Sequence, residues 1–509
     1  MMRRTLPYLF VSAMMTALLA GCSSNMVNTT AVTQSAGTVP VSITMTDDPP
    51  AGVSVLFFQV SLTDATLTPT TGSPVSLLSN NTPVQIDVTQ LQALSAFLST
   101  ANVAAGTYKS LSLTFANPQL VIFNQSDTAL GSTCAVGTVC QLTPAFDNNS
   151  STLSFTSSPF PATVSASSPL GFLIDFHLNT VIQTDLSVNL SVTNGVTISE
   201  LPPAPTPPQF GFLRGTVGMV TASSNQFTLQ TPWGRSFTIN TTSSTAFNNF
   251  PASACKTPGI ACLAQGQIVQ VQISSVGKDG TLTASQVTYV QEATAQTVEG
   301  TIIKILPYPT LAGEEIVQML LHNSPMATSS VPLGGVAQVT FASTATYSID
   351  NKGFTIPSGL SFKGTADVIV GQNVTVTVVP GSLSNTGGAP PSSAWAPPRS
   401  IAFTASAVEL EPSQMTGLIT ATDSSTTSFT LGVGGGPFFA PWPMPAAISM
   451  FNVDTTSQTT YTGFNPDSFS GIAKGELVSV NGWLFASPTS GKPPTIAAQS
   501  VVQRPGLFF

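Results

Sequence analysis

Proline and glycine interrupt this chain every few residues, and this feature restricts its fold more than any other. The 509 residues include 40 prolines and 39 glycines. Proline inside a helix removes a hydrogen bond and clashes with the preceding turn, so long helices are disfavoured. Many short strands joined by turns tolerate such interruptions. The sequence therefore predicts an all-β protein, and its length is enough for roughly three or four domains.

Composition and charge argue against several classes of protein. Charged residues make up 7% of the chain and apolar residues 42%. Beyond the N-terminal segment, no stretch of about 18 apolar residues is free of Ser, Thr, Asn, Gly or Pro, so the low charge does not indicate a membrane span. Ser, Thr and Asn instead suit exposed strand faces and turns. The net charge of −8 provides no basic surface, so we expect no nucleic-acid partner.

The N-terminus has the pattern of an export signal. A basic start precedes an apolar run from Leu6 to Leu19, and two small residues then lead to Cys22. This order is typical of a lipoprotein signal peptide, here residues 1–21, whose removal exposes a cysteine for acylation. Residues 22–37 are rich in Ser, Asn and Thr and are expected to be a flexible tether. Ser23 stands where the inner-membrane retention signal has aspartate. In a cell with two membranes, we therefore expect a lipid anchor in the outer membrane of the cell envelope.

The other four cysteines form two pairs that are local in sequence. Cys134 lies close to Cys140, and Cys255 lies close to Cys262, each pair within a loop rich in small residues. In an exported protein such pairs favour small disulfide-closed loops. Zinc binding is the alternative, but it requires tighter Cys-x2-Cys spacing or added histidines. We therefore predict two disulfides and no metal.

Alternation of apolar and polar residues predicts strands in the first folded part of the chain. Residues 39–45 alternate strictly, which indicates a strand with one buried face. The apolar parity changes at residues 57–58, which predicts a β-bulge. Residues 91–98 carry leucines spaced by three and four, so this segment is expected to be the one helical patch.

Four motifs of this first part recur together in a known family. They are Thr46–Pro49, Asp87–Leu91, Ala105–Tyr108 and Ile174–Phe176. In this respect residues 38–200 resemble a bacterial lipoprotein domain catalogued as domain of unknown function 4382. The resemblance implies an antiparallel β-sandwich and supplies no catalytic residue. The chain departs from the family pattern by having two aspartates in the first motif.

Three later segments repeat one order of motifs. Each opens with a glycine inside an alternating strand, continues with a second glycine before another strand, and closes with Ala-x-x-Val. The opening glycines are Gly215, Gly300 and Gly417, the second glycines are Gly266, Gly371 and Gly475, and the closing motifs start at Ala284, Ala405 and Ala498. Self-similarity of this kind indicates tandem units. We expect three small antiparallel barrels of five or six strands, each with a glycine-marked bend.

A proline-rich segment separates the two parts of the chain. Residues 201–210 are expected to be a semi-rigid linker. The three barrel repeats are assigned to residues 211–293, 294–413 and 414–509, and the middle one carries long insertions. In their recurring glycines and closing Ala-x-x-Val motifs, the repeats resemble a second exported family, catalogued as domain of unknown function 5666.

Few residues suggest chemistry. The chain has two histidines. His177 shares a strand face with Asp175, which could make a metal or acid–base pair, but a metal site needs further ligands. We therefore interpret this pair as solvent-facing and His322 as an exposed turn residue. No serine-hydrolase, zinc-protease or phosphate-loop motif occurs, so no catalytic residue and no cofactor are assigned.

Acidic residues of the first domain suggest a weak calcium hypothesis. Asp47, Asp48, Asp64 and Asp87 could supply carboxylate oxygens. Aspartate also stabilises turns by bonding to its own backbone, and the spacing matches no calcium loop. Turn stabilisation is therefore the preferred interpretation.

Aromatic residues in loops are the more informative feature. Five of them lie among glycines and prolines and are our candidate binding residues: Trp233, Trp395, Phe438, Phe439 and Trp442. Such rings either cover a barrel end or contact a partner. Trp483 lies near a strand end and is expected in the core. We predict that Phe438, Phe439 and Trp442 are at least partly exposed and contact a partner. Glycan is the first candidate because sugar rings present C–H faces that suit flat apolar surfaces.

Together these observations favour a lipid-anchored binding or scaffold protein of the cell envelope without catalytic activity. Its expected partners are the membrane, through the lipid on Cys22, and an envelope polysaccharide or protein that contacts the loops. One alternative is an envelope glycan hydrolase with a carboxylate pair, whose members would meet only in space. A purely structural surface spacer is the other.

Overall fold

A computed structural model describes most of the chain beyond the predicted tether. The described residues are 38–48, 55–78, 83–91, 95–124, 135, 139–147, 151–183, 185–201, 210–232, 235–251, 255–292, 294–306, 313–324, 333–385, 401–432, 450–487 and 491–504. The chain divides into residues 1–36 and one compact unit from residue 37 to 509, and the description below concerns the second of these.

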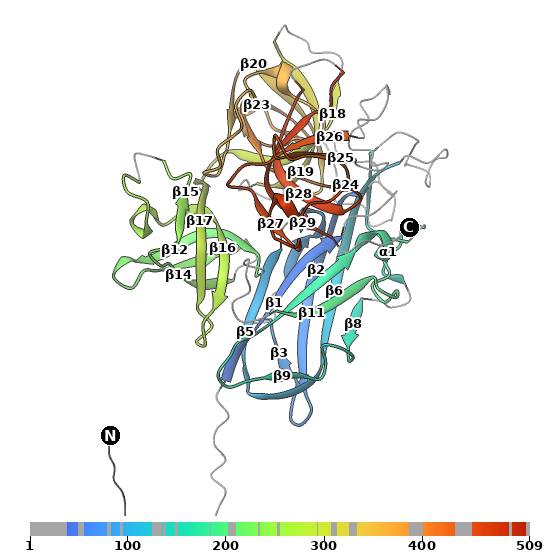
Figure 1. Ribbon diagram of the computed structural model, residues 1–509, viewed down its shortest axis with the longest axis vertical. Coiled ribbons are helices and arrows are strands. Elements are labelled where there is room, and N and C mark those ends of the chain that lie inside the picture. Colours follow the sequence, from blue (N-terminus) through green and yellow to red (C-terminus); the bar gives the residue numbers. More distant parts are fainter. Residues whose placement is uncertain are drawn as a thin grey trace, which may run out of the picture. The chain divides into compact units, whose positions relative to one another are not determined.

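The protein is all-β, as predicted (Figure 1). In the described residues the only α-helix is the short α1 (Leu178–Val181). Single 3-10 turns lie at Val88–Leu91, Ala222–Ser224, Ile260–Cys262, Thr365–Asp367 and Phe469–Gly471. No helix in this part of the chain has the length and apolar character needed to cross a membrane.

Two sheets form the N-terminal β-sandwich. The first has the order β11-β10-β1-β5, and β1 runs parallel to β10 and antiparallel to β5. Its strands are β1 (Thr38–Asp48), β5 (Ala96–Ala104), β10 (Leu170–His177) and β11 (Val196–Leu201). The second sheet is built on the long pair β2 (Val55–Pro69) and β6 (Gly106–Phe123). The shorter strands β3 (Val75–Ser76), β4 (Val84–Asp87), β7 (Val139–Leu142), β8 (Thr152–Phe155) and β9 (Ala162–Val164) pair with β2 or β6.

A continuous hydrophobic core lies between the two sheets. Ile43 and Phe176 come from the first sheet, and Phe58 and Phe115 from the second. The rings of Phe115 and Phe176 meet edge to face with centroids 5.5 Å apart. Because alternate residues of a strand point to opposite faces, the alternating sequence places these apolar side chains on one side. Packing across that layer holds the sandwich together.

Two local predictions for the sandwich, a β-bulge and a helical patch, can be compared with the structure. The predicted bulge at residues 57–58 is wrong, since Phe57 and Phe58 pair in unbroken register with β6. The apolar parity changes there because both side chains are buried, Phe58 in the sandwich core and Phe57 against the second barrel. The predicted helical patch is wrong in its second half: Val88–Leu91 is a 3-10 turn, but Leu98 lies in strand β5. There the pairing of β5 with β1 outweighs a leucine spacing that also suits a helix.

Strand β1 is buried on both faces rather than on one. Ile43 faces the sandwich core, and the polar Ser42 and Thr44 on the opposite face are also buried. Thr44 Oγ1 donates to the backbone oxygen of Phe210, 3.3 Å away, at the start of the first barrel. The prediction of one exposed face fails because a single sequence does not reveal which domain covers a strand.

Three units follow, and each contains a closed circuit of five paired strands. The first contains β12 (Phe212–Thr221), β13 (Gln226–Gln230), β14 (Ser236–Asn240), β16 (Gln267–Val276) and β17 (Leu282–Glu292). The second contains β18 (Thr297–Leu306), β19 (Glu315–Asn323), β20 (Val336–Ile349), β21 (Asn373–Val378) and β23 (Ile401–Glu411). The third contains β24 (Ser413–Asp423), β25 (Ser428–Gly432), β26 (Met450–Asp454), β28 (Leu477–Phe485) and β29 (Thr495–Gln503).

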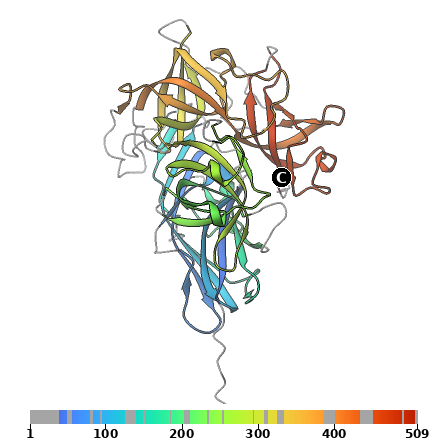
Figure 2. The same ribbon diagram turned by 90° about the vertical axis from the view of Figure 1, so that its left-hand side faces the viewer.

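The second and third units are separate barrels, coloured yellow to orange and red in Figure 2. The first barrel also joins the sandwich sheet through one residue pair, Phe212 with Ala96. Short accessory strands β15 (Ala246–Asn248), β22 (Ser384–Asn385) and β27 (Thr460–Thr462) complete the three units. In every circuit the third strand runs parallel to the last one. This shared strand order agrees with the sequence repeats.

The repeated glycines have a common physical cause. A Cβ atom on Gly215, Gly300 or Gly417 would lie 2.5, 2.2 or 2.4 Å from a carbonyl oxygen of the neighbouring strand. Such a distance is far inside van der Waals contact. The backbone of the first strand can therefore approach the second strand this closely only where the residue is glycine. This close approach explains why glycine recurs at the same place in each repeat.

The second glycine of each unit is also required by the backbone conformation. Gly266, Gly371 and Gly475 have φ angles of +90°, +94° and +90°, the region that favours glycine. Each amide donates to a carbonyl on the first strand of its own barrel, at 2.9, 2.8 and 2.8 Å. The residue that follows each glycine accepts a hydrogen bond from the amide three positions earlier through its side chain. The three units thus close their barrels by one shared turn.

Candidate functional site

The residues predicted to anchor the protein or to contact a partner cannot be placed. Six of them lie outside the described residues: Cys22, Trp233, Trp395, Phe438, Phe439 and Trp442. The connection that carries the last three leaves β25 at Gly432 and enters β26 at Met450. Trp483, expected in the core, is fully buried and stacks on Phe354 with ring centroids 5.1 Å apart.

One of the two predicted disulfides is present among the described residues. Cys255 and Cys262 form a disulfide. Cys140 is also disulfide-bonded, and its predicted partner Cys134 lies outside the described residues. In the described part of the chain, no group of three or more His, Cys, Asp or Glu side chains is arranged to hold a metal ion.

Two of the four acidic residues considered for calcium have local partners, and the side chains of the other two, Asp47 and Asp48, lie outside the described part of the structure. Asp64 accepts a hydrogen bond from Thr66 Oγ1, 2.8 Å away, and Asp87 accepts one from Thr89. These are the turn and strand-end contacts expected of aspartate. Asp175 and His177, interpreted as solvent-facing, are both half-buried, because the first barrel covers part of their sheet.

His322 is buried, and its assignment as an exposed turn residue is wrong. Its side chain is only 5% exposed. Nδ1 lies 3.0 Å from Asp87 Oδ2 of the sandwich, and Nε2 lies 2.9 Å from Thr301 Oγ1 of the second barrel. The amide of Gln90 lies 3.2 Å from Nδ1. A hydroxyl, an imidazole and a carboxylate in this order resemble a nucleophile relay. Because the ring is enclosed and its partners come from both the sandwich and the second barrel, we interpret it as a contact that fastens these two domains.

A second buried polar group joins the barrels to one another. Arg214 Nη1 of the first barrel lies 2.6 Å from Glu299 Oε2 of the second. Lys352 Nζ lies 3.0 Å from Asp350 Oδ2 and 2.9 Å from Glu411 Oε2. We call these five residues the junction cluster. Its three carboxylates and two cations leave one carboxylate in excess.

Burial and charge act in opposite directions on the acids of the junction cluster. Burial alone raises the pKa of Glu299, but Arg214 and Lys352 outweigh it and hold the pKa at about 2. Burial raises the pKa of Glu411 to about 8; Lys352 opposes this rise and Asp350 adds to it. Glu411 is therefore the carboxyl group of the cluster that takes up a proton most readily, which lowers the excess negative charge. We interpret such a buried group as one that fixes the arrangement of neighbouring units.

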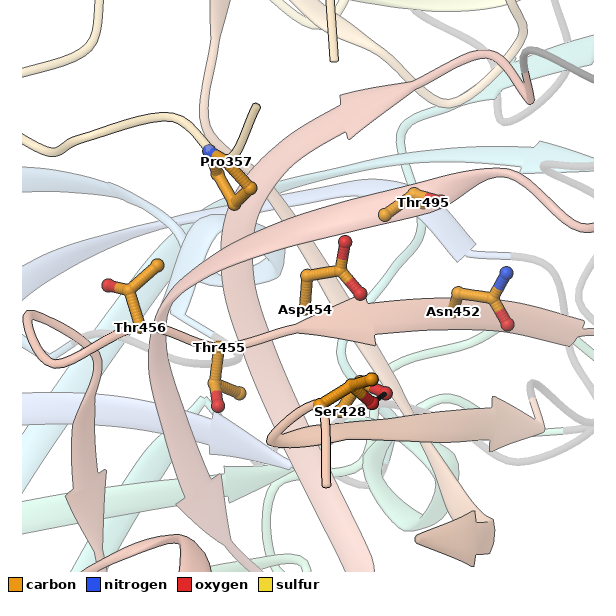
Figure 3. Close-up of a pocket in the computed structure, with 8 residues that line it drawn as sticks. Pro357, Ser428, Asn452, Asp454, Thr455, Thr456 and Thr495 are labelled. Atoms are coloured by element: carbon orange, nitrogen blue, oxygen red, sulfur yellow. Dashed lines mark hydrogen bonds between the residues drawn. The ribbon is translucent and has the colours of Figure 1, made fainter. Parts of the chain in front are cut away.

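An open pocket lies on the outer face of the third barrel. It has a volume of about 530 Å³, within the range of small-molecule sites. The residues that define it here are Pro357, Ser428, Asn452, Asp454, Thr456 and Thr495. Figure 3 shows Asn452 and Asp454 projecting from the same side of β26. Strands β25 and β29 flank β26, so the site rests on a rigid surface.

The pocket contains an acid without a partner. Among the described residues, the carboxylate of Asp454 forms no hydrogen bond or ion pair, and burial alone raises its pKa. The backbone pairing places Ser428 opposite Asp454 and Thr495 opposite Asn452. Residues opposite each other on neighbouring strands lie about 5 Å apart at Cβ, so these four side chains form one polar cradle.

Part of this site could have been predicted from the sequence. Phe451 and Val453 are buried, so Asn452 and Asp454, at the alternating positions, necessarily point outward. The approach of Thr495 and of Pro357 from the second unit depends on barrel closure and on docking between units. No local pattern encodes those two contacts.

The comparison with known families bears on the first domain. No curated protein matches this chain at a significant level. Residues 37–192 match the family described as "Domain of unknown function (DUF4382)". The match covers the sandwich from β1 to β10 and ends just before β11. The resemblance inferred from the four motifs is thereby confirmed, and the β-sandwich at the start of this chain is a domain of the DUF4382 family.

Proposed function

We propose that this protein is a lipid-anchored binding or scaffold protein of the cell envelope, without catalytic activity, that contacts polysaccharide through its third barrel. The lipid would be carried by Cys22, after removal of residues 1–21, and the outer membrane is the proposed location. The three barrels are further proposed to be copies of the exported family catalogued as domain of unknown function 5666.

The observation that carries this proposal is the polar pocket of the third barrel. Hydroxyl, amide and carboxylate groups converge there on the outer face of packed strands. These are the groups that exchange hydrogen bonds with sugar hydroxyls. A site on rigid strands loses little entropy on binding, which favours selective recognition. Phe438, Phe439 and Trp442, which lie outside the described residues, are proposed as additional contacts because their rings suit the C–H faces of sugars.

The contacts between domains support a scaffold role. His322 fastens the sandwich to the second barrel, and the junction cluster fastens the first barrel to the second. Trp483 of the third barrel donates a hydrogen bond to the backbone oxygen of Asp350, 2.8 Å away. Specific buried polar contacts favour a defined arrangement over freely jointed domains. A defined arrangement would hold the pocket at a fixed place relative to the sandwich domain.

The glycan-hydrolase alternative lacks a specific observation in its favour. Such enzymes need two accessible carboxyl groups about 5 to 9.5 Å apart. In the described residues, Asp350 and Glu411 converge, but both are buried against the ammonium of Lys352. Asp454 is accessible but stands without a second carboxylate in its pocket. We therefore propose binding rather than cleavage.

A binding assay tests the proposal. The full chain in detergent micelles should bind purified envelope polysaccharide, and the glycan should remain uncleaved by size and reducing-end analysis. Trp442→Ala should weaken binding without changing the melting temperature. Release of shorter glycans would support the hydrolase alternative. Absence of binding to every envelope polysaccharide tested would leave the structural spacer as the better description.

A further inference from the structure

The pocket of the third barrel contains an ionisable group whose charge is not neutralised. Asp454 lies on β26 between Ser428 of β25 and the end of β29. Within the described residues no cation, hydroxyl or amide is bonded to its carboxylate. A partly desolvated carboxylate without a partner is unfavourable, and a ligand that brings a donor or a positive charge removes that penalty.

We propose that this pocket recognises an amino sugar, with its protonated amine against Asp454 and its hydroxyl groups against Asn452, Ser428 and Thr495. This inference rests on the proposed glycan-binding function and specifies the class of sugar. A neutral sugar would leave the carboxylate without a counter-charge, and an acidic sugar would meet repulsion. The charge of the site therefore selects against both.

The other pocket residues decide between a sugar and a bare amine. Asn452 lies two residues from Asp454 on the same face of β26, and its amide can both donate and accept hydrogen bonds. Ser428 and Thr495 add hydroxyl groups on the two flanking strands. Pro357 contributes an apolar surface at the edge of the pocket (Figure 3). A volume of about 530 Å³ exceeds what an ammonium group alone requires.

The repeats provide a control on folding. The register places Phe451 and Val453 of β26 where β14 of the first barrel has Phe237 and Ile239. Asp454 then corresponds to Asn240, the residue that follows Ile239. The same barrel position thus already holds asparagine in the first unit. Asp454→Asn should therefore fold normally, so that a loss of binding reports on the ligand contact.

The test is isothermal titration of the full chain in detergent micelles with three trisaccharides. The probes are β-1,4-linked trimers of glucosamine, N-acetylglucosamine and glucose. The glucosamine trimer should bind best, and Asp454→Asn should weaken its binding about tenfold or more while changing the other two by less than about threefold. Asn452→Ala should weaken all three. Asp467→Asn is the matched control, since its Oδ1 only accepts from the amide of Phe464, a bond that asparagine keeps.

Lowering the pH should weaken binding of the glucosamine trimer at a higher pH than an ordinary aspartate would. Because burial raises the pKa of Asp454, its carboxylate takes up a proton at a higher pH than an ordinary aspartate does. Affinity for the glucosamine trimer should be highest between the pKa of Asp454 and that of the sugar amine and fall as the pH drops through the pKa of Asp454, whereas Asp454→Asn should show no such fall on the acid side. Added salt should also reduce the preference for the amine.

Each outcome decides a separate point. Equal binding of the glucose and glucosamine trimers would overturn the amino-sugar inference and leave the proposed glycan binding standing. Binding of the glucosamine trimer that Asp454→Asn does not weaken would overturn the assignment of the pocket. Ethanolamine binding as tightly as the trimer would show that a bare amine suffices and refute sugar recognition. If none of the trimers binds, the inference and glycan binding at this pocket both fail.

Discussion

Replacing Glu299 by glutamine should destabilise the protein in a pH-dependent way. Glu299 Oε2 accepts a hydrogen bond from Arg214 Nη1, 2.6 Å away, across the boundary between the first and second barrels. The substitution keeps the size of the side chain and removes its charge. Arg214 then remains partly buried beside a neutral amide, and Lys352 also loses a neighbouring negative charge.

The magnitude follows from the pKa of Glu299. Burial raises this pKa, but the two cations outweigh burial and lower it from 4.5 to about 2. At about 1.4 kcal/mol per pKa unit, the ionised carboxylate contributes about 3 kcal/mol to the free energy of unfolding. Because the folded pKa lies below the unfolded one, this stability is present above pH 4.5 and is lost as the pH falls towards 2. Glu299→Gln should therefore cost about 3 kcal/mol at pH 7 and about half of that or less by pH 3.

Urea denaturation between pH 7 and pH 3 measures this effect, because urea, unlike guanidinium, does not screen charges. The matched control is Glu292→Gln, an exposed carboxylate at the end of β17. A double-mutant cycle with Arg214→Met separates the ion pair from other effects. A loss below about 1 kcal/mol at pH 7, or a loss that is the same at both pH values, would refute the electrostatic reasoning.

Three further predictions concern the anchor, a disulfide and a domain contact. Cys22→Ala should move the protein from the membrane fraction to the soluble fraction, and an unacylated wild-type N-terminus in mass spectrometry would contradict this. Cys255→Ser should lower the free energy of unfolding by about 2 kcal/mol, as expected for opening a short loop, without preventing folding; peptide mapping without reductant should recover the pair Cys255–Cys262. Gly334→Ala should loosen the contact between the second barrel and the sandwich by about 1 to 3 kcal/mol, since its Cβ would lie 2.5 Å from Phe57 Cε1. Hydrogen exchange of β2 should then become faster, and unchanged exchange would contradict the docking.

The fold class and the repeats could be predicted because their causes are local. A glycine such as Gly300 is required by backbone contact inside one barrel, so it recurs in sequence wherever the same bend recurs. Strand alternation likewise reflects a core inside one unit. The shared turn before the fourth strand of the circuit adds a second local mark at Gly371. Such features can be read from one chain because each depends on few residues close in sequence.

The contacts between units could not be predicted in the same way. His322 looked like an exposed turn residue because its partners, Asp87 and Gln90, lie more than 200 positions away. Nothing near His322 in the sequence indicates that a second domain covers it. The polar pocket was missed for the same reason, since Thr495 and Pro357 reach Asp454 only through the tertiary fold. The aromatic loop residues were found by composition, and their contacts stay a prediction.

One position shows how copies of a single barrel come to be joined in a fixed order. The residue before the opening glycine is Arg214 in the first unit, Glu299 in the second and Thr416 in the third. The first two form an ion pair with each other, whereas Thr416 Oγ1 lies 2.6 Å from Ser479 Oγ inside its own barrel. Opposite charges at equivalent sites attract unlike copies, and two identical copies would repel there. Three different residue types occupy this position in three barrels of the same strand order, so the position can vary and specify the neighbour. Exchanging the two charges, as Arg214→Glu with Glu299→Arg, should therefore preserve the pairing better than either single change.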